Sequence, residues 1–353
     1  MRLRTSAIAI IAIALMMAGG WAVSQTRADA RTPLAEAMDS VPADARVAGF
    51  TDWAGIRKLL GSDPVASAAD RDTLVGDAFK RDLSSRSIME NFAEPMDKGF
   101  GWSVADLRWE MYSQATHGAV LTAGLDTNVA KSTVTGGLES LGYAEDGDVW
   151  SLPDGKLTSV LPGLPGTFRF AAYFSRDRLI AFSDNADYLA KIATAHRHHG
   201  RTLAGVAAAR DVAAPLVGSL SAAISVKADA CKSTGLADQP SSVRSQGRNV
   251  VRPLGTLSTY RYGGRAIFDD GDDAHLAFSM TFSSGVQATR QMALRTALTR
   301  GPYVGGTGQV TDVLQLRSAH VEGSTGTFDF GFTPNRESFM TGVGPLLFAA
   351  CSV

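Results

Sequence analysis

Short segments in which apolar and polar side chains alternate recur along this chain, and they predict β-strands. One of them runs from Arg108 to Ser113, and others are "GAVLTAGL", "TFRFAAYFS" and "AHLAFSMTFSS". Between such segments the apolar residues recur at helical spacing, as in "WAGIRKLLG". We expect Asp52 to cap this helix and Gly61 to end it. The pattern therefore predicts a mixture of strands and helices.

One order of elements is found twice. The first copy starts at "GAVLTAGL", continues with a helix that Asp126 should cap, and includes hairpins at Asp146-Gly147 and Arg176-Asp177. The second copy starts at "AHLAFSMTFSS", has a helix at "GVQATRQMALRTALTRG", and pairs "DVLQLRSAHVEGS" with "GTFDFGFTP". "NADYLAKIATAHRHHG" and "NRESFMTGVGPLLFAAC" are expected to close the two copies as helices. Sequence identity between the copies is negligible, so both a true duplication and a coincidence of element order remain open.

This order predicts an α+β fold with mostly antiparallel sheets and helices packed on one face. It also predicts two related strand-helix-strand-strand-helix halves. We divide the chain into a leader or anchor (1–30), an N-terminal helical and strand segment (31–115), a first α+β half (116–226), a linker or long loop (227–255) and a second half (256–353).

The N-terminus has the pattern of an export signal. Arg2 and Arg4 precede an uncharged, mostly apolar stretch from Ala7 to Val23. "Ala28-Asp29-Ala30" fits a cleavage site, and the apolar stretch is near the minimum of about 17 residues that a membrane span needs. The sequence predicts an extracytoplasmic protein, either anchored through residues 7–23 or secreted after cleavage near Ala30.

The composition and the missing motifs argue against some classes of function. The formal net charge is −1 and the charged residues are scattered, which argues against a nucleic-acid partner. Hydrophobic residues make up 45% of the chain, as in an ordinary globular protein. No G-x-S-x-G, H-E-x-x-H or Walker motif is present, and we expect no cofactor.

The chain has two cysteines, Cys231 and Cys351. Their separation fits neither a metal site nor a redox pair. In an oxidising compartment they would form one disulfide between the middle and the end of the chain. The alternative is two small buried apolar side chains.

Four further groups of residues are candidate sites. His196, His198 and His199 could bind a transition metal, although histidines at a helix C-terminus also interact favourably with the helix dipole. "FDDGDDAH" resembles a calcium loop in charge alone, and a solvated hairpin turn is the favoured interpretation. Tyr260, Arg261 and Tyr262 could stack on a sugar or a peptide, or belong to an exposed sheet face. His320 and Glu322 share one strand face and could act as an acid-base pair, or simply face solvent.

Three stretches carry a family resemblance: "AMDSVPADARVAGFTDWAGIRKLLG", "GWSVADLRWEMY" and "ESLGYAEDGDVWSL". With them the chain resembles a group of uncharacterised exported proteins of high-GC Gram-positive bacteria. The resemblance implies an N-terminal leader or membrane segment and an outward-facing domain. It implies no activity and no site residue.

We therefore favour a non-enzymatic cell-envelope protein that binds or scaffolds a partner, either an envelope protein or a small ligand. One alternative is an envelope hydrolase with a dispersed active site, which would gather perturbed histidine and carboxylate groups in one cleft. Another is a carrier of an apolar ligand, which would have a cavity of a few hundred Å³ between sheet and helices.

Overall fold

A computed structural model describes residues 32–197, 200–226, 229–231, 236, 239–333 and 346–351. The expected leader and its cleavage site lie outside these residues. None of the helices in the described ranges is both long enough and apolar enough to cross a membrane.

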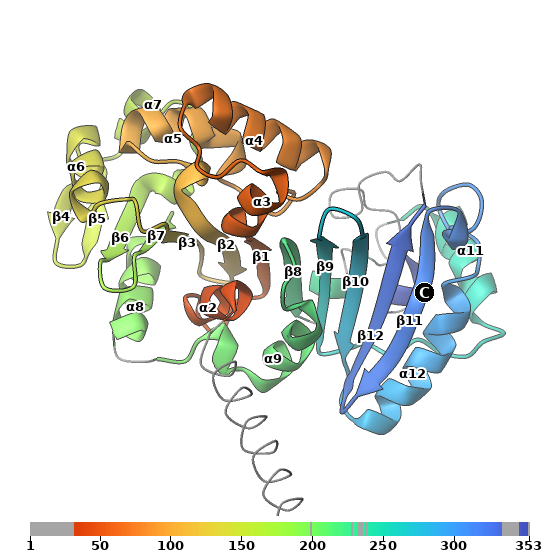
Figure 1. Cartoon of the computed structure of the whole chain (residues 1–353). Coiled ribbons are helices and arrows are strands. Elements are labelled where there is room, and N and C mark those ends of the chain that lie inside the picture. Colours follow the sequence, from red (N-terminus) through yellow and green to blue (C-terminus); the bar gives the residue numbers. More distant parts are fainter. Residues whose placement is uncertain are drawn as a thin grey trace, which may run out of the picture.

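The described residues form one antiparallel sheet, and Figure 1 shows it running through the whole molecule. From edge to edge its 12 strands are β11 (Leu314–Glu322), β12 (Thr325–Phe332), β10 (Ala274–Thr281), β9 (Tyr262–Asp269), β8 (Ser221–Val226), β1 (Val47–Thr51), β2 (Leu107–Ala115), β3 (Gly118–Leu125), β7 (Leu179–Ser183), β6 (Phe170–Phe174), β5 (Val149–Ser151) and β4 (Ala144–Asp146). The pairing of β1 with β8, in which Gly49 lies opposite Ala223, joins the two parts of the sheet. The predicted antiparallel α+β class is confirmed.

The strands on either side of the β1–β8 junction follow the same order. Outward from the junction, one side reads β1, β2, β3, β7, β6 and the other reads β8, β9, β10, β12, β11. On each side a helix connects the third strand to the outermost of these five, α6 (Lys131–Leu141) on one side and α12 (Gly285–Leu298) on the other. The first half adds the β4–β5 hairpin between its helix and β6. The correspondence therefore includes two strands more in each half than the sequence pattern indicated.

Helices lie against both faces of the sheet, whereas the sequence pattern predicted helices on one face only. We call the face that carries Gly49 and Ala223 face A, and the face that carries Ala48 and Phe50 face B. Face A is covered by α3 (Trp53–Leu60), α4 (Ala68–Lys80), α5 (Ala93–Phe100), α6, α7 (Lys156–Val160), α11 (Ser241–Val251) and α12. Face B is covered by α2 (Pro33–Asp39), α8 (Ala186–Arg197) and α9 (Ala207–Ala213). Because apolar residues on each face of β1 and β8 are covered, two hydrophobic cores form, one on each side of the sheet.

Short 3₁₀ helices connect these elements. They are η1 (Glu90–Phe92), η2 (Val104–Asp106), η3 (Gly166–Arg169), η4 (Leu203–Gly205), η5 (Ala214–Leu216), η6 (Val310–Asp312) and η7 (Leu347–Ala349). The last of these packs into the face A core although it is close to the C-terminus.

Local signals in the sequence predicted several boundaries. The Asp52 side chain accepts a hydrogen bond from the Gly55 N–H at 2.9 Å, and Gly61 ends α3 with a φ of 64°. This is the left-handed conformation that glycine adopts without strain. The hairpin at Asp146-Gly147 connects β4 to β5, and the hairpin at Arg176-Asp177 connects β6 to β7.

Two local predictions are wrong. Asp126 does not cap α6, which begins at Lys131; its carboxylate pairs instead with the guanidinium of the buried Arg57 at 2.7 Å. The segment expected to be a linker contains α11. This helix is polar on its exposed side, and its Gly247 allows a close approach to Leu236, where an added Cβ would lie 2.2 Å from a leucine methyl. Its buried residues are too few to give a strong apolar pattern in the sequence.

A candidate ligand-binding cleft

A cleft of about 380 Å³ lies on face A where the two halves of the sheet meet. Its lining residues come from β1, β8, β9 and β10 and from the segments above them: Val47, Arg86, Ala223, Ser225, Asp229, Ala230, Tyr260, Gly263, Gly264, Arg265, Phe278, Ser279, Met280 and Ala349. The volume is at the lower end of the roughly 300–1,000 Å³ found for small-molecule sites. The floor is the sheet itself, and the two walls come from different halves of the chain.

Small residues on the floor make room for this cleft. Gly49 on β1 and Ala223 on β8 are paired across the junction, and Gly263 follows on β9. A Cβ added at Gly49 would lie 3.4 Å from the Arg86 side chain, and one added at Gly263 would lie 2.6 Å from the Tyr260 ring. The walls therefore approach the floor closely because these positions lack side chains.

The first wall is the segment 81–92, which lies between α4 and α5 and includes η1, and it is held down by Glu110 of β2. The Glu110 carboxylate is fully buried and accepts hydrogen bonds from Ser87 Oγ at 2.5 Å and from the N–H groups of Ile88 and Met89 at 2.6 and 3.0 Å. Trp53 Nε1 donates a fourth bond at 3.2 Å. Burial raises the pKa of Glu110, while these four donors oppose that shift. One carboxylate thus fixes the backbone of the wall.

A second carboxylate lies in the same wall. Glu90 is buried and accepts a hydrogen bond from Ser84 Oγ at 2.5 Å. Burial raises the pKa of Glu90 to about 7, and the negative charges of Glu110 and Asp82 add to the shift. Its protonation state therefore changes near neutral pH.

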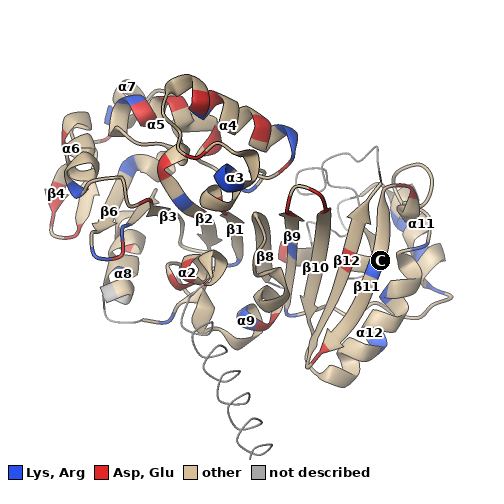
Figure 2. Ribbon diagram, in the orientation of Figure 1, with Lys and Arg blue, Asp and Glu red and all other residues tan. Residues whose placement is uncertain are grey.

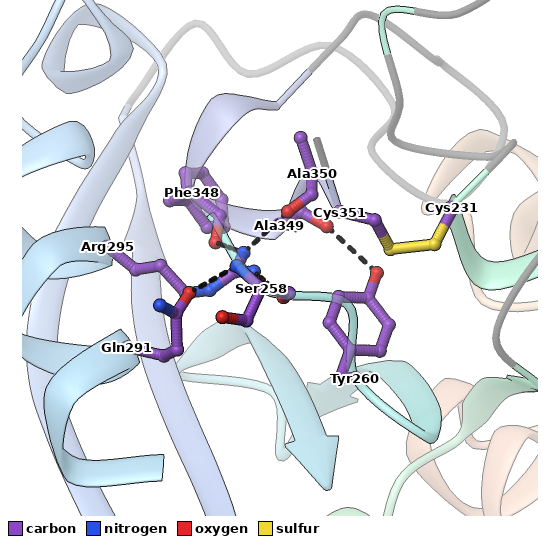
Figure 3. The surroundings of a disulfide bond; sticks show 9 residues. All are labelled: Cys231, Ser258, Tyr260, Gln291, Arg295, Phe348, Ala349, Ala350 and Cys351. Atoms are coloured by element: carbon purple, nitrogen blue, oxygen red, sulfur yellow. Dashed lines mark hydrogen bonds between the residues drawn. A yellow bond between two sulfur atoms is a disulfide. The ribbon is translucent and has the colours of Figure 1, made fainter. Parts of the chain in front are cut away.

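The second wall includes η7 and the disulfide that the sequence predicted. Cys231 and Cys351 are bonded, with their Cα atoms 5.3 Å apart, and Figure 3 shows the bond beside Tyr260 and Ala349. Tyr260 Oη donates a hydrogen bond to the Ala349 carbonyl at 2.8 Å. Tyr260, Ala230 and Ala349 all line the cleft, so the disulfide joins two parts of its wall.

Arg295 of α12 anchors the same wall from behind. Its guanidinium is fully buried and donates to the carbonyls of Phe348 and Ala350 at 2.7 and 2.8 Å, and to the Ser258 carbonyl at 3.0 Å (Figure 3). Burial lowers the pKa of Arg295 to about 10. Because both of its terminal NH₂ groups donate to carbonyl oxygens, this cation has a structural role, although its Nε has no hydrogen-bond partner in the described part of the chain.

Two arginines reach the cleft itself. Arg265 lies on the floor and is 7% exposed, while Arg86 comes from the first wall. Burial and the neighbouring Arg86 charge lower the pKa of Arg265 to about 9, and Asp82 partly offsets this. Burial also lowers the pKa of Arg86. Charged groups of both signs are otherwise scattered over the helices and loops, as Figure 2 shows.

Most of the candidate site residues predicted from the sequence lie far apart in the structure. His196 lies at the end of α8 and pairs with Asp177 at 2.9 Å; His198 and His199 lie outside the described residues. Tyr260 and Tyr262 do not share an exposed face, because Tyr260 belongs to the face A core and Tyr262 packs against the face B core. Among the described residues, no three His, Cys, Asp or Glu side chains are grouped to hold a metal ion.

The acidic stretch "FDDGDDAH" forms the β9–β10 turn, and its carboxylates form ion pairs and hydrogen bonds with other groups of the protein. Asp269 pairs with Arg81 at 2.5 Å, and Asp273 pairs with Arg317 at 2.5 Å. The Asp270 carboxylate accepts the N–H groups of Asp272 and Asp273. The Arg81–Asp269 pair also links the first wall of the cleft to the second half of the sheet.

His320 and Glu322 lie on one face of β11, as expected, and line a hollow of about 430 Å³. Asp211 and Pro215 at the α9–η5 connection form its other side. This hollow is on face B, away from the cleft. It brings the two candidate residues together, and the hydroxyl residues Ser324, Thr325 and Thr327 also line it.

Apart from Tyr260 and the two cysteines, the sequence pattern did not indicate the residues that build the cleft. Glu110 and Arg265 occupy strand positions whose neighbours are apolar, so alternation alone would assign them to solvent. Their positions face a second layer of helices and loops instead. A signal for this was the length of the connections that follow β1 and β8, since long connections on one face can cover a sheet.

Comparisons with known proteins identify no family. A scan against models of protein families finds no match, and a search of curated proteins finds none either. Among solved structures, crystal form I of TP0453 shares 10% identity at a TM-score of 0.40, covering 86% of this chain and 94% of that one. Crystal form III shares 10% identity at a TM-score of 0.34, covering 92% of this chain and 98% of that one. Crystal form IV shares 9% identity at a TM-score of 0.36, covering 86% of this chain and 94% of that one. Superpositions this loose support no statement about function.

Proposed function

We propose that this protein is a non-enzymatic binding module of the cell envelope, which holds a small ligand in the cleft at the β1–β8 junction. The main observation behind this proposal is that both walls of the cleft are held in place by buried contacts within the protein. A recess of about 380 Å³ lies between two walls that are separately fixed, one by Glu110 and one by the disulfide and Arg295. Walls fixed before a ligand arrives reduce the ordering cost of binding.

The envelope location rests on two supports. The leader pattern at Ala7–Val23 predicts export, and a disulfide is compatible with an oxidising compartment. The resemblance to exported proteins of high-GC Gram-positive bacteria agrees with this proposal. Retention through residues 7–23 and release after Ala30 are its two forms, and the mass of the mature protein would distinguish them.

The test is native mass spectrometry of the unreduced protein isolated from its own cell envelope and medium. We expect an additional bound mass in the natural protein. Ala223→Phe fills the floor of the cleft and should abolish the bound mass, whereas the control Ala223→Ser should retain it. A bound mass that survives Ala223→Phe, or none in the natural protein, would contradict the proposal.

A further inference from the structure

Two arginines, Arg86 and Arg265, line the cleft. Arg86 belongs to the first wall and Arg265 to the floor, and burial lowers the pKa of each guanidinium. The positive charge of Arg86 also lowers the pKa of Arg265. Like charges in a region of reduced dielectric repel, so an arrangement of this kind costs free energy unless a negative charge is close.

Asp82 provides part of that negative charge. It belongs to the same segment as Arg86 and raises the pKa of both arginines. Asp229 also lines the cleft, but its carboxylate pairs with Arg46 at 2.8 Å. The Asp82 carboxylate therefore offsets part of the positive charge in the cleft, and a bound anion would stabilise both guanidinium groups.

Arg86 has unused capacity to donate hydrogen bonds. Its Nε is buried and has no hydrogen-bond partner among the described residues. Buried polar groups are nearly always bonded, and an unpaired one needs an explanation. The fork of an arginine fits the paired oxygens of a carboxylate or phosphate.

The remaining lining is largely apolar. Phe278 and Met280 lie on β10 beside the floor, and Tyr260, Ala230 and Ala349 form the second wall. The Tyr260 hydroxyl already donates to Ala349, so its ring contributes apolar surface. A ligand that matches both parts has a charged end and an apolar body.

We propose that the cleft is selective for an amphiphilic oxyanion, whose carboxylate or phosphate lies between Arg86 and Arg265 and whose apolar part packs on Phe278 and Met280. This inference rests on the proposed binding function and names its ligand class. A phosphate and a carboxylate share the oxygen geometry that the arginines recognise, and the experiment separates them.

The test is isothermal titration calorimetry of the full-length protein with four probes. They are octyl phosphate, octanoate, octanol and inorganic phosphate. We expect octyl phosphate or octanoate to bind at least tenfold more tightly than octanol, which lacks the charge, and than inorganic phosphate, which lacks the apolar body. Preference between the first two assigns the head group.

Variants then assign the contact. Arg86→Gln should weaken binding of the charged probe at least tenfold, about 1.4 kcal/mol, and bring it to the level of octanol. Arg86→Lys keeps the positive charge but lacks the forked guanidinium, so its affinity for the charged probe should lie between those of the natural protein and Arg86→Gln. The matched control Arg290→Gln removes an exposed arginine on α12 and should leave binding unchanged.

The outcomes separate this inference from the proposed function. Equal binding of octanol and octyl phosphate, lost in Ala223→Phe but unchanged in Arg86→Gln, would overturn the oxyanion while keeping the cleft as a binding site. Failure of all four probes with the natural protein would also overturn it. The bound mass from the envelope decides the proposed function independently.

Discussion

Glu90 shows how a single buried residue couples this protein to pH. Its carboxyl is buried in the first wall next to Glu110 and Asp82, and its pKa is about 7 in the folded protein. In the unfolded chain the value is near 4.5. The folded protein therefore holds a proton at pH values where the unfolded chain has lost it.

This difference predicts the direction of a stability change. The stabilisation from the protonated Glu90 is fully present below about pH 4.5 and is lost as pH rises through about 7. Glu90→Gln keeps an acceptor for Ser84 and does not titrate. At pH 8 the variant should be more stable than the natural protein by about 1–2 kcal/mol, and at pH 4.5 the two should be equal.

Urea unfolding of both proteins at several pH values, with the disulfide intact, measures this difference. Glu94→Gln is a suitable control, because Glu94 is an exposed partner of Lys98 on α5. Stability curves for Glu90→Gln and the natural protein that stay parallel from pH 4.5 to 8 would show that Glu90 does not carry the effect.

At the scale of an element, the first wall depends on Glu110. Glutamine at this position would keep one acceptor oxygen and place an NH₂ group against the donors of the wall. We expect Glu110→Gln to lower the free energy of unfolding by about 2 kcal/mol or more, since buried donors of Ser87, Ile88 and Met89 lose partners.

Hydrogen exchange of the segment 81–92 tests where this effect acts. The amides of this segment should exchange faster in Glu110→Gln than in the natural protein, while the exchange rates of the β10 amides should be the same in both. Gln114→Glu on the same strand face changes charge without touching the wall contacts and serves as the control. Unchanged exchange at Ile88 and Met89 would mean that Glu110 does not hold the wall.

The elements that the sequence predicted are those whose signals are local. Asp52 and Gly61 bound α3, and the hairpin turns follow from short polar pairs, because each depends on a few neighbouring residues. Glu110 and Arg265 could not be assigned in this way. Whether a polar residue on an alternating strand faces water or a second layer depends on what covers that face, and the covering segments come from distant parts of the chain. For the same reason α11 was taken for a linker.

At the scale of the molecule, the cleft follows from the correspondence between the two halves. The connection from β1 to β2 supplies the first wall and the connection from β8 to β9 supplies part of the second. These connections occupy equivalent places in the two halves and lie on the same face of one sheet (Figure 1). They therefore face each other across the β1–β8 junction, with small residues between them.

The disulfide then has a role beyond general stability. It ties Cys231, on the β8–β9 connection, to Cys351 next to η7, across a separation of 120 residues. Closing so long a loop stabilises a fold by about 2–4 kcal/mol, mainly by restricting the unfolded chain. Both partners adjoin residues of the cleft wall, so breaking the bond should also loosen the binding site.

The double variant Cys231→Ser, Cys351→Ser should therefore lose about 2–4 kcal/mol of unfolding free energy and bind octyl phosphate or the native ligand several-fold more weakly at temperatures where it remains folded. Urea unfolding and calorimetry measure the two effects, and a reductant added to the natural protein should reproduce both. The same reductant should not change the double variant. If stability falls while affinity is retained, the wall is held by Arg295 and Tyr260 alone; if both thiols of the unreduced, unfolded protein react with a maleimide, the bond is not formed.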